Sequence, residues 1–163
     1  MLQWEIFSMV RIFIATLVAV SGSFQVSNIR DERLSGTTWY LSYMAEVQPI
    51  NPIQFRIRFD FQTSTSNEPM IFGKMICNYI FGKYASPITN SLNIIDWSST
   101  TAFCLPPSAS EREQEFENRM KRAATYKVEY ESGHRTLTFY DASRFRMLSF
   151  ITLNQSYLPI VTR

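Results

Sequence analysis

The chain has 163 residues with 16 Lys plus Arg, 14 Asp plus Glu and a single His, so its formal net charge is +2. This balance argues against the dense basic face that binds phosphate backbones, and we expect no nucleic-acid partner. Hydrophobic residues make up 45% of the chain and charged residues 18%. That composition excludes an intrinsically disordered chain, because it can bury enough apolar surface to fold. The length predicts one domain.

An apolar run at residues 12–20 lies near the amino terminus, between Arg11 and the small residues Ser21, Gly22 and Ser23. This order is typical of a secretory signal peptide, and the run is too short to span a bilayer. We expect a signal peptide at 1–23, a linker at 24–33, one domain at 34–153 and a tail at 154–163. A buried amino-terminal helix or strand is the alternative. No Cys stands at the cleavage point, so we expect a periplasmic or secreted protein without a lipid anchor or a stable membrane span.

Cys77 and Cys104 are the two cysteines of the chain. An even count in an exported protein predicts a disulfide, which here would close a loop of about 28 residues. The alternative is that either cysteine is a small buried hydrophobic residue.

Strand patterns dominate the middle of the chain. Residues 55–61 alternate apolar and charged side chains, which predicts a half-buried antiparallel strand with Arg56 and Arg58 on its solvent face. These arginines either bind an anion or are simply solvated, and solvation is the favoured interpretation. Residues 38–44 and 70–77 predict two further strands. Three short strands near 126–130, 136–140 and 145–152 predict a meander.

One helix interrupts the strands. Ser110 and Glu113 have the spacing of a capping box, and we expect the helix to begin there. Phe116, Met120 and Ala123 then form one apolar stripe. The combination predicts an α+β domain. Its small antiparallel sheet either curls into an open or partial barrel closed by the helix, or packs one face against the helix.

Patterns that carry catalysis are nearly absent. His134 is the single histidine, so two Cys and one His give at most three zinc ligands at unsuitable spacings. The sequence also has no glycine-rich phosphate loop and no Gly-x-Ser-x-Gly elbow. We therefore expect no catalytic residue, no metal and no cofactor. A Cys–His nucleophile pair that includes His134 is the less favoured alternative.

An unusual aromatic segment spans residues 77–84. Asn78 and Gly82 are expected at turn or bulge positions, because both tolerate the left-handed region. Tyr79, Phe81 and Tyr84 form either an exposed surface for a protein partner or an apolar ligand, or part of the core.

Several segments of the chain, taken in order, resemble the sequence pattern of the META domain family, whose bacterial members are called HslJ-like heat-shock proteins. They comprise Leu-Ser-Gly-Thr-Thr-Trp-Tyr-Leu at 34–41, Gly-Lys-Met-Ile-Cys-Asn-Tyr-Ile-Phe-Gly-Lys-Tyr at 73–84, Thr-Thr-Ala-Phe-Cys at 100–104, Glu-Phe at 115–116, and the hairpin segments at 126–128 and 137–139. The resemblance runs from about Leu34 to Phe150. It implies a small curled sheet closed by one helix, and a family linked to envelope stress and secretion without an established catalytic activity.

Two functions follow as hypotheses. The first is a non-enzymatic exported protein that binds another protein or an apolar ligand, in envelope stress or secretion. The alternative is a small β-barrel carrier of a lipid or hydrophobic ligand, in which the aromatic side chains line a cavity instead of filling a core.

Overall fold

The computed structural model describes residues 31–47, 51–61, 68–86, 89–131 and 133–153. The predicted signal peptide, most of the predicted linker and the predicted tail lie outside these residues. The elements in chain order are β1 (Thr38–Met44), the 3-10 turn η1 (Pro52–Gln54), β2 (Arg56–Phe61), β3 (Pro69–Lys74), β4 (Tyr79–Ala85), β5 (Asn93–Ser99), α1 (Pro107–Arg122), β6 (Thr125–Glu131), β7 (His134–Tyr140) and β8 (Arg146–Ile151).

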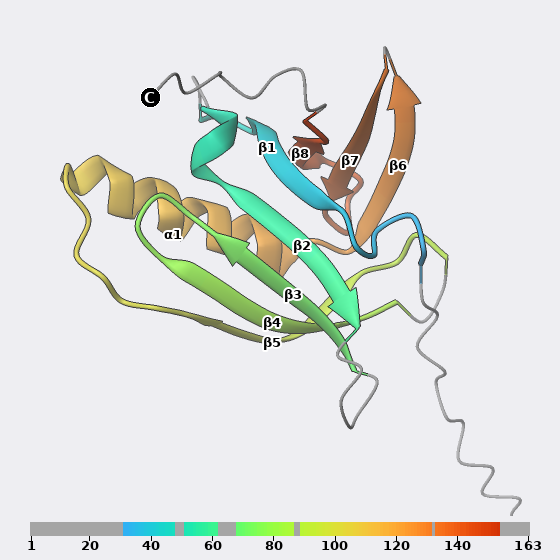
Figure 1. Ribbon diagram of the computed structural model, residues 1–163, viewed down its shortest axis with the longest axis horizontal. Coiled ribbons are helices and arrows are strands. Elements are labelled where there is room, and N and C mark those ends of the chain that lie inside the picture. Colours follow the sequence, from blue (N-terminus) through green and yellow to red (C-terminus); the bar gives the residue numbers. More distant parts are fainter. Residues whose placement is uncertain (1–30, 48–50, 62–67, 87–88, 132, 154–163) are drawn as a thin grey trace, which may run out of the picture.

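All eight strands belong to one sheet, in the order β5-β4-β3-β2-β1-β8-β7-β6. Strands β1 to β5 form one antiparallel meander, α1 follows, and β6 to β8 form a second meander. Strand β8 then pairs with β1, which joins the two meanders. Figure 1 shows the sheet curling, with α1 on its inner side. The predicted α+β fold with a curled antiparallel sheet and one helix is confirmed.

The two edges of the sheet touch at one end. Leu92 N donates to Ala124 O at 2.9 Å, and Tyr126 N donates to Asn90 O at 2.9 Å. These bonds surround a single bridge between Ser91 and Thr125, just outside β5 and at the start of β6. The sheet is therefore a partial barrel whose edges meet at one short seam without pairing along their length.

Aromatic rings fill the inside of the curl. The Phe116 ring of α1 lies 5.1 Å from the Phe55 ring centroid and 6.2 Å from that of Phe150. Phe139 and Phe150 are 5.5 Å apart in an edge-to-face arrangement, which favours ring packing. Six large side chains of this core are at most 1% exposed: Trp39, Phe55, Phe59, Phe116, Phe139 and Phe150. The side chains that a carrier would use to line a cavity thus pack against one another.

The region around β4 differs from the expectation. The strand predicted at 70–77 ends at Lys74, where residues 75–78 turn into β4 and Met75 N donates to Asn78 O at 2.7 Å. Asn78 lies in this turn as predicted. Gly82, in contrast, lies inside β4, where a Cβ atom would meet Asp96 O of β5 at 2.7 Å. Glycine at this position allows the two strands to approach closely.

The helix begins earlier than its apparent capping box. Helix α1 starts at Pro107, and its N-cap residue Pro106 makes no side-chain cap bond. Proline suits a first helical turn because its missing N–H would be unpaired there in any case. The expected start at Ser110 is therefore wrong, and Glu113 has a different role. Among the described residues, no helix combines the length and apolar character needed to cross a membrane.

Candidate functional site

Two rows of side chains cross β1, β2, β3 and β4 on the outer face of the sheet. Cross-strand register makes the first row Tyr40, Arg56, Lys74 and Tyr79, and the second row Thr38, Arg58, Phe72 and Phe81. The rows lie two residues apart along each strand, and strand side chains alternate between faces, so both rows project outward. We call these eight residues the outer rows.

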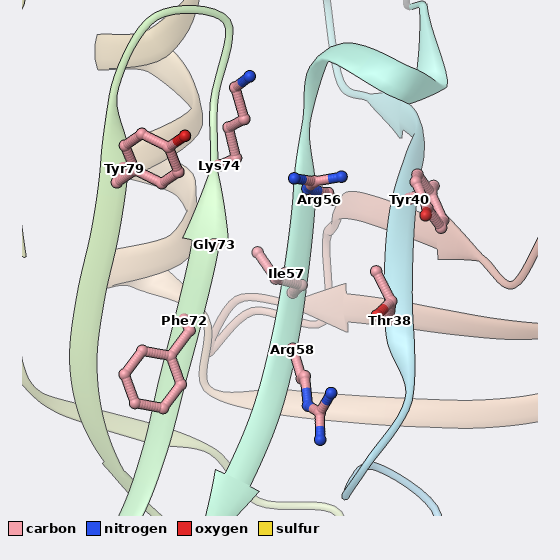
Figure 2. Close-up of a pocket in the computed structure, with 9 residues that line it drawn as sticks. All are labelled: Thr38, Tyr40, Arg56, Ile57, Arg58, Phe72, Gly73, Lys74 and Tyr79. Atoms are coloured by element: carbon pink, nitrogen blue, oxygen red, sulfur yellow. The ribbon is translucent and has the colours of Figure 1, made fainter.

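A shallow groove of about 270 Å³ lies among the outer rows. Figure 2 shows its lining, with Arg56 central, Tyr79 and Lys74 on one side and Tyr40 on the other. Gly73 lies between Phe72 and Lys74 in this lining. A Cβ atom at Gly73 would come within 2.7 Å of both the Arg56 carbonyl oxygen and the Ile80 side chain, so close packing of β2, β3 and β4 requires glycine here.

Positive charge is concentrated at the centre of the groove. Exposed Arg56 lies directly opposite Lys74, and like charges in this position destabilise a strand pair. Within the described part of the chain, no acidic side chain lies within salt-bridge distance of either residue. Neighbouring cations on the same strands are paired, since Arg58 contacts Asp60 at 3.2 Å and Lys83 contacts Glu68 at 2.8 Å. The ammonium group of Lys74 lies 5.9 Å from the Tyr79 ring centroid, within cation–π range.

The three aromatic residues predicted for a binding surface divide between two faces. Tyr79 is 49% exposed and Phe81 44% exposed, whereas Tyr84 is 2% exposed. Odd-numbered residues of β4 point outward and even-numbered ones inward. Phe81 packs edge-to-face on Phe72 at 6.2 Å, while Tyr84 packs edge-to-face on Phe59 at 5.2 Å in the core. Tyr79 and Phe81 thus share the outer face, and the expectation that Tyr84 belongs to the same surface is wrong.

A disulfide joins Cys77 and Cys104, with their Cα atoms 5.8 Å apart. This separation is in the ordinary range for a disulfide. The bond ties the β3–β4 turn to the segment that leads into α1.

Glu113 occupies the space beneath this turn. Its side chain is buried at 4% exposure. Its Oε1 atom accepts hydrogen bonds from Cys77 N at 2.5 Å and Asn78 N at 3.0 Å, and its Oε2 atom accepts from Asn78 Nδ2 at 2.6 Å. The Asn78 Oδ1 atom in turn accepts from Ala102 N at 2.7 Å and from Thr100 Oγ1 at 2.9 Å. The carboxylate therefore holds the turn, and sequence reasoning missed this role because the spacing from Ser110 already gave Glu113 a local explanation.

The same residues form a cluster of metal-binding types, because one donor atom each from Cys77, Cys104 and Glu113 lies within 4.8 Å of the others. Both sulfur atoms belong to the disulfide, and a disulfide sulfur is not the thiolate that zinc prefers. The carboxylate oxygens are directed at the turn's N–H groups. With the disulfide formed, the three residues stabilise the β3–β4 turn.

A second cluster of polar side chains stabilises the seam between the two sheet edges. Tyr126 Oη donates to Asp31 Oδ2 at 2.5 Å, and Arg33 contacts Asp31 at 2.6 Å and Asn90 Oδ1 at 2.7 Å. Burial, together with the hydrogen bond to Asp31, raises the pKa of Tyr126 to about 12. Burial alone would raise the pKa of Asp31, but hydrogen bonds from Arg33 and Tyr126 hold it below its ordinary value. The phenol therefore stays neutral and the carboxylate charged at neutral pH.

The sequence and the fold were compared with those of known proteins. The family model described as the META domain matches residues 32–152. A solved structure, the NMR structure of a protein from Burkholderia xenovorans, is 18% identical and aligns with a TM-score of 0.58 over 75% of this chain and 85% of that chain. At this identity the likeness shows a shared fold. No curated protein matches the chain. With most of the described residues inside the matched region, the chain belongs to the META domain family.

Proposed function

We propose that this META domain protein is an exported, non-enzymatic binding protein that holds another protein on the outer face of β1 to β4. The protein would act in the cell envelope or outside the cell, and it would take part in envelope stress or secretion. The disulfide supports an extracytoplasmic location, since such bonds persist in oxidising compartments. The predicted signal peptide at 1–23 agrees with that location.

The observation that carries this proposal is the exposure of Tyr79 and Phe81 beside the groove. Large aromatic side chains are enriched at protein interfaces, where they supply much contact area for little conformational entropy. Strand β4 holds both rings on a rigid face, so a partner would meet a preformed surface. The packed interior favours this function over the carrier, because a lipid would have to displace fully buried rings.

Site-specific photocrosslinking tests the proposal. A photoreactive amino acid replaces Phe81, and in a matched control it replaces Tyr130, an aromatic residue of β6 that is 77% exposed. We expect a discrete adduct with an exported or envelope protein from position 81, and its loss when Tyr79→Ala is added. No adduct at position 81, or the same adducts from positions 81 and 130, would contradict the proposal.

A further inference from the structure

We infer that the groove of the outer rows recognises an acidic segment of the partner protein, with one carboxylate between two apolar or aromatic side chains. The inference rests on the proposed function, because it names the chemistry of the partner that the same face would bind. Three features support it: uncompensated positive charge, the order of the side chains across the strands, and the absence of a phosphate cradle within the groove's lining.

The first feature is the juxtaposed pair Arg56 and Lys74. The two cations are cross-strand neighbours, and neither has an acidic partner among the described residues. Arg58 and Lys83, on the same face, each have a carboxylate within 3.2 Å. An uncompensated like-charge pair on a sheet destabilises the free protein, and one anion bound between the two charges would remove that repulsion. A guanidinium and an ammonium group on directly opposite residues of neighbouring strands suit a carboxylate, which can accept from both.

The second feature is the order of the first row, which places an aromatic residue at each end of the cationic pair. Tyr40 and Tyr79 are separated by three inter-strand steps, or about 14 Å at the usual strand spacing. An extended peptide covers about the same distance in four residues and directs its side chains i, i+2 and i+4 to one side. A segment of the type aromatic-x-acidic-x-aromatic therefore matches Tyr40, the Arg56 and Lys74 pair, and Tyr79 in turn.

The third feature separates a carboxylate peptide from a phosphate ligand. Phosphate sites commonly use several free backbone N–H groups at a helix start or a nest. The groove is lined by residues of the paired strands β1 to β4, whose backbone groups bond mainly to neighbouring strands, and Tyr79 N donates to Thr100 Oγ1 at 3.0 Å. Because Arg58 is paired with Asp60, the anion-binding capacity of the groove rests on the side chains of Arg56 and Lys74, which fits a single carboxylate better than a chain of phosphates.

Fluorescence anisotropy on the purified protein with its disulfide intact tests the inference. The probe is a labelled heptapeptide, Ser-Tyr-Ser-Glu-Ser-Tyr-Ser, and its matched control has Gln in place of Glu. We expect the acidic peptide to bind at least tenfold more tightly than the Gln peptide, and its binding to weaken as salt is raised. Arg56→Gln and Lys74→Gln should each weaken binding about fivefold, the upper range for one exposed charge contact. Lys127→Gln, which removes a lysine paired with Glu129 on β6, should leave binding unchanged.

Three results would overturn the inference. These are equal binding of the Glu and Gln peptides, unchanged binding by the Arg56→Gln and Lys74→Gln variants, and tighter binding of a labelled oligothymidylate than of the acidic peptide. Circular dichroism of each variant shows whether its fold is retained. Crosslinking from position 81 in the doubly substituted Arg56→Gln, Lys74→Gln protein provides a second measurement. A crosslink from position 81 that persists in this double variant would retain the proposed function while rejecting the acidic partner. Absence of a crosslink from position 81 in protein without the Arg56 and Lys74 substitutions would reject the proposed function itself.

Discussion

Asn78 Nδ2 donates a hydrogen bond to Glu113 Oε2 at 2.6 Å, which joins the β3–β4 turn to the middle of α1. The same turn is held by the disulfide between Cys77 and Cys104. Strand β4, which presents Tyr79 and Phe81, begins directly after it. The buried carboxylate and the disulfide therefore fix the end of the strand that carries the exposed aromatic side chains.

Removal of the Glu113 carboxylate should destabilise the domain strongly. Glu113→Ala leaves the N–H groups of Cys77 and Asn78 and the Asn78 amide without their acceptor, at a cost of about 3 kcal/mol in the free energy of unfolding. Urea denaturation measures this change. Glu111→Ala, an exposed position on the same helix, is the matched control and should change stability by less than about 0.5 kcal/mol. Equal effects of the two substitutions would contradict the role given to Glu113.

Loss of the disulfide should lower the melting temperature under oxidising conditions. Cys77 and Cys104 are 27 residues apart in sequence. In the chain-entropy model a bridge over such a loop contributes about 3 to 4 kcal/mol, by restricting the unfolded chain. Cys104→Ser should therefore melt well below the oxidised wild type in differential scanning calorimetry. Wild-type protein treated with a reductant should melt near the variant, and an unchanged melting temperature would show that the bridge contributes nothing.

The seam should weaken at high pH. Because the pKa of Tyr126 is about 12 in the folded protein and near 10 in the unfolded chain, its contribution is complete below pH 10 and is lost as the pH rises through 12. The difference in unfolding free energy between wild type and Tyr126→Phe should thus shrink from pH 9.5 to pH 12. The separation between the folded and unfolded pKa values of Tyr126 determines the size of this decrease. Urea denaturation of both proteins across this range measures it. A constant difference would contradict the assigned pKa.

Gly73→Ala should destabilise the sheet beneath the groove. The new methyl group would meet the Arg56 carbonyl oxygen and the Ile80 side chain, each at 2.7 Å. Overpacking of this kind costs about 1 to 3 kcal/mol in the free energy of unfolding. The added substitution Ile80→Val removes the Cδ1 atom from this contact, but the contacts with Ile80 Cγ1 and with the backbone oxygen remain. Only part of the loss should therefore be recovered, and full recovery would show that the two remaining contacts are unimportant.

Local patterns predicted much of the fold. Strict alternation at 55–61 predicted β2 and placed Arg56 and Arg58 on the outer face, as the structure shows. Strand β5 escaped prediction because it is an edge strand with mostly exposed side chains, and its adjacent Ile94 and Ile95 break the alternation. The start of α1 was misplaced because the four-residue pattern from Ser110 to Glu113 reports only local bonding. It gives no sign that Glu113 serves a turn 35 residues earlier in the chain.

The candidate site was predictable only in part. Position parity along β4 separates Tyr79 and Phe81 from Tyr84, and this signal was present in the sequence. The pairing of Arg56 with Lys74 and the groove itself depend on cross-strand register. Register is determined by long-range packing, which the spacing of residues within one strand does not reveal.

Chemical-shift mapping provides the most direct test that the outer face of β1 to β4 is the binding surface. Isotope-labelled protein is titrated with the heptapeptide Ser-Tyr-Ser-Glu-Ser-Tyr-Ser, and backbone amide shifts are followed residue by residue. If the outer face binds the peptide, the largest shift changes should cluster on the outer rows, around Arg56, Lys74 and Tyr79, while the amides of α1 and of the β6–β7 hairpin stay unchanged. Largest changes on α1 or at the seam between β5 and β6 would contradict it.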